Sequence, residues 1–177
     1  AVFDRRADDL AADYGELSFV GQEQNGTDEV TGLIEPGALT VAPDGRHVYA
    51  VSAADDSVVV FQRNIGTGSA AFGELTFVAA YSEGGGIAGL AGAADVAVSP
   101  DGAFVQVLGA AGGTLALFER NATSGELTFV EFKADGTSGT TGLAGASRLR
   151  FSPDGAHLYV AGEAVDAVVR FDVGADG

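Results

Sequence analysis

Short runs in which apolar and polar residues alternate dominate this chain. One such run extends from Asp95 to Ser99, and an apolar run resumes at Phe104 to Leu108. Alternation with a period of two places the apolar side chains on one face of a β-strand. The intervening Pro100-Asp101-Gly102 supplies the residues that a tight turn needs. The pattern therefore predicts a β-hairpin.

Two further strands follow this hairpin and complete a unit of four, which we call strands A to D. Gly112-Gly113 provides the second turn, and a polar loop separates the last two strands. The same order recurs on either side, although the last copy lacks its D strand. The predicted strands are 39–41, 47–51, 58–63 and 74–78, then 95–99, 104–108, 114–120 and 126–130, and finally 149–151, 157–160 and 167–171.

Two repeated phrases mark the copies. Gly-Glu-Leu-Thr/Ser-Phe-Val begins at Gly15, Gly73 and Gly125, and Pro-Asp-Gly recurs at prolines that are 57 and 53 residues apart. A four-stranded antiparallel unit repeated at this period is typical of the blade of a β-propeller, with strand A at the channel and strand D outermost. We therefore expect an all-β fold of about three blades per chain.

The repeat resembles one known family in particular. Ser-Pro-Asp-Gly followed by His157-Leu158-Tyr159-Val160, Val-Val-Val-Phe in strand C and the Leu-Thr-Phe-Val phrase are similar to the lactonase-like (YVTN-type) propeller repeat. The resemblance covers nearly the whole chain and implies a propeller fold, with lactone hydrolysis as one associated activity. The same kind of blade also serves binding modules and surface proteins.

The chain ends predict an unusual division into blades. Residues 1–21 read as a partial C strand and a D strand, 37–80 and 93–132 as whole blades, and 146–173 as a blade without strand D. The arrangement is permuted, so we expect the N-terminal strand to complete another blade. Two chains that exchange this strand would form a six-bladed homodimer; alternatively, the sequence is a piece of a longer propeller.

Composition narrows the classes of partner and site. The 25 acidic residues exceed the 9 basic ones, for a net charge of -16, which disfavours nucleic acid and anionic membranes as partners. This acidity is typical of cation binding, of a salty environment or simply of solubility. Without cysteine the chain has no disulfide, thiolate site or cysteine nucleophile. No apolar run is long enough for membrane insertion. We expect an extracellular or periplasmic location.

Three polar residues of the A strands are candidates for lining the channel. Asp95 and Arg148 occupy equivalent positions whose charge changes between repeats, and Arg150 lies on the same strand face as Arg148. Guanidinium groups fit carboxylates and phosphates, so a small anionic ligand is predicted. Alternatively, Asp95 forms a structural ion pair with an arginine. The alternate A-strand positions are apolar in every copy and are expected to form the core between blades: Leu39, Val41, Val96, Val98, Leu149 and Phe151.

Other candidates for chemistry are weaker. Asp55 and Asp56, like Asp8 and Asp9, are adjacent loop carboxylates that suit calcium, although neither pair continues as a calcium-binding loop. We interpret these pairs mainly as solvated surface and expect no other cofactor. His47 and His157 recur at the start of strand B, where the middle copy has Ala103, and are interpreted as scaffold residues.

No catalytic residues can be assigned from these patterns. The sequence therefore favours a non-catalytic propeller scaffold for binding or assembly, completed by self-association or by further blades. The alternatives are a lactonase-like hydrolase and a calcium-dependent adhesive module of a surface protein.

Overall fold

A computed structural model describes residues 2–5 and 17–174, in which the predicted all-β architecture is confirmed. Its β-strands form three larger sheets and one hairpin, and the one helical element among the described residues is the short 3-10 turn η1 (Glu163–Val165). No described helix has the length and apolar character that crossing a membrane requires.

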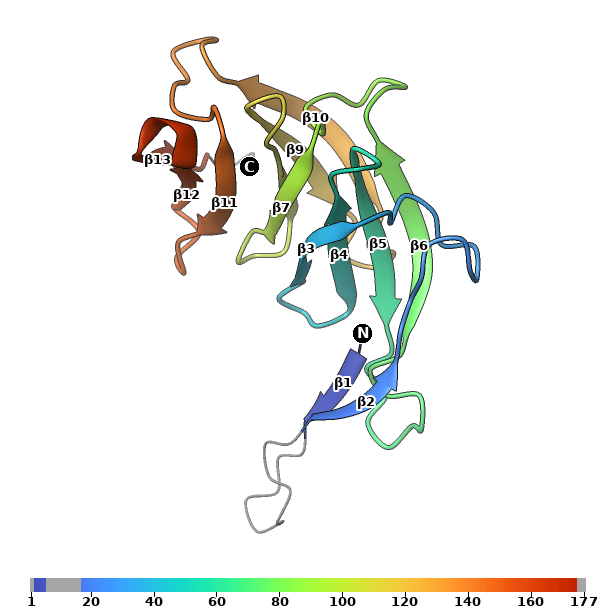
Figure 1. The fold of residues 1–177 in the computed structure, drawn as a ribbon. Coiled ribbons are helices and arrows are strands. Elements are labelled where there is room, and N and C mark those ends of the chain that lie inside the picture. Colours follow the sequence, from blue (N-terminus) through green and yellow to red (C-terminus); the bar gives the residue numbers. More distant parts are fainter. Residues whose placement is uncertain (1, 6–16, 175–177) are drawn as a thin grey trace.

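The three larger sheets are antiparallel meanders whose strands pair in sequence order (Figure 1). We call them blades 1, 2 and 3. Blade 1 contains β3 (Pro36–Val41), β4 (His47–Ser52), β5 (Ser57–Arg63) and β6 (Leu75–Ser82). Blade 2 contains β7 (Ala93–Val98), β8 (Phe104–Gly109), β9 (Thr114–Arg120) and β10 (Leu127–Ala134). Blade 3 contains β11 (Ala146–Phe151), β12 (His157–Gly162) and β13 (Ala167–Asp172).

The N-terminal hairpin forms a sheet of its own. It pairs β1 (Val2–Arg5) with β2 (Leu17–Gly21). These are the strands expected from the partial C and D copies. The structure pairs them with each other, so completion of another blade by β2 stays a prediction. Strand β13 has β12 as its one neighbour in the described sheet.

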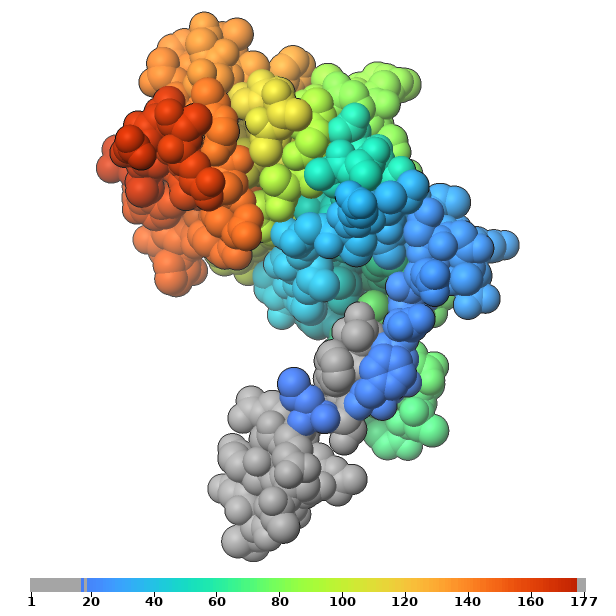
Figure 2. Space-filling view, in the orientation of Figure 1, coloured from blue at the N-terminus to red at the C-terminus, as the bar shows by residue number. Residues whose placement is uncertain are grey.

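The inner strands of successive blades lie side by side, so the blades stack face to face around one axis. Strand β7 contacts β3 on one side and β11 on the other. Figure 2 shows the resulting arc, with blade 3 at one end in orange and red. The structure therefore has the blade order of a propeller, with the A strands innermost.

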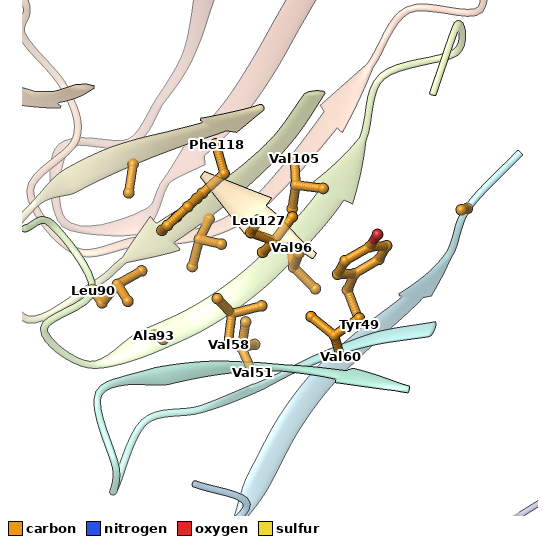
Figure 3. Close-up of a cluster of buried hydrophobic side chains, with 13 residues drawn as sticks. Tyr49, Val51, Val58, Val60, Leu90, Ala93, Val96, Val105, Phe118 and Leu127 are labelled. Carbon is orange, nitrogen blue, oxygen red and sulfur yellow. The ribbon is translucent and has the colours of Figure 1, made fainter. Parts of the chain in front are cut away.

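The core consists of side chains packed between neighbouring blades. Tyr49, Val58 and Val60 of blade 1 meet Val96 and Phe118 of blade 2, and all five are buried (Figure 3). A second cluster joins blades 2 and 3. This packing explains the alternation in sequence, because each blade has one face for each neighbour.

Two A-strand positions that the repeat assigned to this core are exposed, which corrects that expectation. Val96 and Leu149 are each 1% exposed, whereas Leu39 is 65% and Val41 is 49% exposed. The physical reason is that β3 contacts one other inner strand, β7, so the opposite face of β3 has no blade against it among the described residues. An apolar A-strand position is therefore buried only where another blade packs against that face.

Strands β4 and β5 of blade 1 are covered by the segment that precedes β3. Val30 and Leu33, from the segment that precedes β3, pack with Val48, Val59 and Phe61. This segment therefore buries the part of the blade that lies farther from the axis.

Candidate functional site

The candidate site begins with Asp95, which lies on the inner strand of blade 2 with only 2% of its surface exposed. Its Oδ2 accepts hydrogen bonds from the Leu149 backbone N–H at 2.9 Å and from Arg150 Nη1 at 2.7 Å. Its Oδ1 accepts from the Val96 N–H at 3.0 Å. A buried carboxylate needs hydrogen-bond donors to offset the loss of water, and Asp95 has three. Asp95 therefore joins the inner strands of blades 2 and 3.

The two arginines of β11 differ in their contacts. The Arg150 side chain is 67% exposed although Nη1 is fixed on Asp95. The Arg148 Nη1 donates to the Ser147 carbonyl oxygen of its own strand at 2.6 Å. The structure thus brings Asp95 and Arg150 together, while Arg148 lies on the same strand without a described contact to Asp95. Both guanidinium groups keep donors for an oxygen-rich ligand.

Asp55 and Asp56, the candidates for calcium binding, accept hydrogen bonds from backbone N–H groups. Asp55 Oδ2 accepts from the Ile34 N–H at 2.7 Å, and Asp56 Oδ1 accepts from the Gly92 N–H at 2.6 Å. Within residues 2–5 and 17–174, no three His, Asp or Glu side chains gather as metal ligands would. Asp8 and Asp9 lie outside the described residues. The carboxylates of Asp55 and Asp56 connect neighbouring loops, and calcium binding stays a prediction.

Sequence reasoning missed a second polar cluster, which lies between blades 1 and 2. Arg120, at the end of β9, is 6% exposed and donates from Nε to the Tyr49 hydroxyl at 2.8 Å and from Nη2 to Asp44 Oδ2 at 2.7 Å. Arg120 Nη1 donates to the Gly102 carbonyl at 2.9 Å, and the Tyr49 hydroxyl donates to the Gly125 carbonyl at 2.9 Å. We call Asp44, His47, Tyr49 and Arg120 the seam cluster.

His47 completes the seam cluster and has a defined tautomer. Its Nδ1 lies 2.9 Å from Arg120 Nη2. Because a guanidinium has only donors, Nδ1 accepts, and the neutral ring carries its proton on Nε2. Burial lowers the pKa of His47 below its usual value, and the positive charge of Arg120 lowers it further. Nε2 is buried with no hydrogen-bond partner in the described part of the chain.

The charge of Arg120 is balanced by Asp44. Burial by itself would raise the pKa of Asp44, but hydrogen bonds from Arg120 and from the Arg46 N–H outweigh it and hold this pKa below its usual value. Burial raises the pKa of Tyr49, so its hydroxyl keeps its proton. The buried Arg120 guanidinium therefore meets one ionised carboxylate and three neutral acceptors, namely the Tyr49 hydroxyl, His47 Nδ1 and the Gly102 carbonyl.

Two of the residue types in the seam cluster, arginine and histidine, recur at equivalent positions of the repeat. Arg63 and Arg120 both end a C strand, and His47 and His157 both begin a B strand. The residue that begins the B strand of blade 2 is Phe104, not Ala103, which corrects the alignment by one position. Phe104 cannot accept a hydrogen bond, so the seam between blades 2 and 3 has no equivalent of this cluster.

Comparison with known proteins agrees with the fold. A family model described as "Lactonase, 7-bladed beta-propeller" matches residues 9–140. The solved structure of the Pseudomonas aeruginosa periplasmic gluconolactonase PpgL is 28% identical with a TM-score of 0.61, over 78% of this chain and 36% of that one. No curated protein matches the chain.

Two further structures support the fold alone. A protein from Lactobacillus plantarum is 24% identical with a TM-score of 0.71, over 95% of this chain and 47% of that one. A functionally unknown protein from Desulfotomaculum acetoxidans is 23% identical with a TM-score of 0.69, over 97% and 46%. The chain thus spans between about a third and a half of the length of these structures.

These findings confirm the resemblance seen in the repeat and correct the functional expectation. A non-catalytic scaffold is wrong as the main interpretation, because the matching family is one of lactonases and a gluconolactonase is among its structural neighbours. A six-bladed ring also disagrees with the seven blades of this family.

Proposed function

The chain belongs to the lactonase family of seven-bladed β-propellers, and from this premise we propose that it is part of a lactonase-like hydrolase. The match to residues 9–140 is the observation that carries the proposal. The inner-strand arginines supply a chemical reason, since exposed guanidinium groups suit a substrate whose reacting group is an ester carbonyl.

Lactone hydrolysis sets a clear electrostatic demand. The oxygen of water adds to the carbonyl carbon with loss of a proton, the carbonyl oxygen becomes an oxyanion, and the ring C–O bond then breaks as the ring oxygen takes up a proton. Ionisation of the product carboxylic acid releases one net proton. Donors placed at the developing oxyanion lower the barrier. We assign this role to Arg148 and Arg150, which also fit the carboxylate of the product.

Asp95 is a positioning residue in this scheme. Its carboxylate is buried and accepts three N–H groups, one of them from Arg150. It therefore holds the Arg150 guanidinium beside the inner strand, while the rest of that side chain stays open to solvent.

A sugar lactone is the proposed substrate class, and the periplasm or the cell exterior is the proposed location. Both are supported by the Pseudomonas aeruginosa periplasmic gluconolactonase, at 28% identity. The hydroxyl groups of a sugar lactone are hydrogen-bond acceptors, which suits the free donors of the two arginines.

The test is proton release during hydrolysis of glucono-δ-lactone in a pH-stat, compared with a protein-free blank. We expect catalysed release by the wild type and a loss of about 100-fold in kcat/KM for Arg150→Gln, as for other oxyanion donors. The matched control is Arg170→Gln, which removes an exposed arginine of β13. Equal rates for wild type and blank would reject the proposal.

A further inference from the structure

A polar hollow lies at one end of blade 1, beside the β3–β4 turn and the β5–β6 loop. The segment that leads into β7 lies at the other end. The turn after β4 and the segment before β7 share one end, because Asp56 accepts the Gly92 N–H. The β3–β4 turn and the β5–β6 loop lie at the other end, where the Arg63 N–H bonds to the Arg46 carbonyl at 2.7 Å. A hollow of about 390 Å³ opens there, which is within the usual size range of small-ligand sites.

The lining of this hollow has a charge opposite to that of the chain. Its side chains include two arginines and four neutral hydrogen-bonding groups, but no carboxylate. In a chain with 25 acidic and 9 basic residues, this local excess of cations separates the hollow from the general surface. The polar lining residues are Arg46, Gln62, Arg63, Asn64, Thr76 and Thr123.

Several of the donors in the hollow are fixed in place before any ligand binds. The Arg63 guanidinium lies 5.0 Å from the centre of the Phe72 ring, and its Nη1 donates to the Gly45 carbonyl at 3.3 Å. Asn64 Oδ1 accepts the Gly66 N–H at 2.9 Å, so the amide nitrogen of Asn64 keeps its two donors. Such fixed donors bind a ligand at a lower entropic cost.

The buried ring of His47, from the seam cluster, borders the same hollow. Its Nε2 carries a proton without a partner among the described residues and lies on the side of the ring that packs against Gly125. An orphaned buried donor is costly unless an acceptor reaches it. The lining is therefore rich in donors and lacks an ionised acceptor.

From this lining we propose that the hollow binds a small oxyanion, either a carboxylate or a phosphate. Guanidinium groups form paired hydrogen bonds with both. Threonine hydroxyls and side-chain amides complete the contacts with the remaining oxygens. The site is separate from the inner-strand arginines and does not depend on lactone hydrolysis.

The test uses inorganic phosphate and gluconate as probes, each titrated into the protein. Binding is followed by the ¹⁵N shifts of the two imidazoles, since the chain has only two histidines. We expect saturable shifts at His47 and none at His157. A response to one probe alone assigns the site to that oxyanion.

Variants distinguish this site from general attraction to positive charge. Arg46→Gln and Arg63→Gln should each weaken binding by about tenfold, as the loss of a charged hydrogen bond does, and Arg170→Gln should leave it unchanged. Because Arg63→Gln also loses its contacts with Gly45 and Phe72, Thr123→Val serves as a second, milder variant and should weaken binding less. No saturable shift with either probe, or equal weakening in all four variants, would overturn the proposal.

Discussion

Arg120 has more polar partners than either Asp95 or Arg150, and it gathers them where two blades meet. It contacts Asp44, His47, Tyr49 and the Gly102 carbonyl while almost fully buried. Removing one partner of a buried ion pair leaves the other without compensation. The stability of this seam therefore depends on a residue that hydrophobic patterning alone does not identify.

We predict that Arg120→Ala lowers the free energy of unfolding by about 3 kcal/mol, because it leaves Asp44 and Tyr49 without their shared donor. Arg63→Ala is the matched control, since Arg63 ends the C strand of blade 1 but is only half-buried. Its loss should cost about 1 kcal/mol. Urea unfolding of the two variants measures the difference, and equal losses would contradict the assignment.

Gly125 makes the second prediction at this scale. It has a φ of +81°, and a Cβ there would lie 2.3 Å from the ring carbon Cδ2 of His47. Gly26 has a similar φ of +84° and no atom within 4 Å of an added Cβ. Gly125→Ala should therefore lower the melting temperature well beyond Gly26→Ala, because only the former adds a clash to the backbone strain. Similar melting temperatures would show that the loop moves aside.

The depressed pKa of His47 predicts how stability changes with pH. Its pKa is below 6.5 in the folded protein, so the unfolded chain binds the proton more readily. The stabilising contribution is complete above pH 6.5 and declines as the pH falls below that value. Thermal melts at several pH values should show this loss in wild type and in His157→Gln, but less in His47→Gln. If the stability of His47→Gln fell with decreasing pH as steeply as that of the wild type, this prediction would be contradicted.

At the scale of elements, the faces of the blades carry most of the information in the sequence. The alternation in strands A to C and the Pro-Asp-Gly turns predicted the meanders, because turn residues and period-two patterns are local properties. The outer strands were predicted too short: β6 continues to Ser82 and β10 to Ala134. Small residues such as Ala79 and Ala80 give no alternation, and pairing with the full length of the C strand extends these strands.

The polar sites were harder to predict because their contacts join residues that are far apart in the sequence. Asp95 and Arg150 were found from repeat positions at which charge varies, and their contact joins two blades. Arg120 and Asp44 are 76 residues apart in sequence. Only the packing of one blade on the next brings them together, and no local pattern records that distance.

Equivalent positions on two blade faces give a direct test of blade packing. Val58 is 0% exposed between blades 1 and 2, whereas Val168 at the same position of blade 3 is 74% exposed. Val58→Ala should cost about 2 kcal/mol through the cavity it leaves, and Val168→Ala close to zero. Chemical unfolding of both variants measures this contrast. A large loss for Val168→Ala would mean that its face is covered in solution.

At the scale of the whole molecule, both ends of the arc expose apolar side chains of a blade face. Leu39 and Val41 at one end, and Val168 at the other, are apolar and exposed. Apolar faces of this kind favour association, so self-association remains a prediction. Sedimentation velocity should show the average mass rising with concentration, less so for Leu39→Thr combined with Val168→Thr. A constant mass equal to one chain would contradict it.

Lactone hydrolysis at the inner strands is the central claim at this scale, and one comparison of initial rates tests it most directly. Proton release from glucono-δ-lactone is measured for the wild type and for Arg148→Gln combined with Arg150→Gln, each after subtraction of the protein-free rate. We predict a clear catalysed rate for the wild type and a loss of about 100-fold or more in the double variant. A double variant that hydrolyses the lactone as fast as the wild type would contradict the assignment of the inner strands as the site.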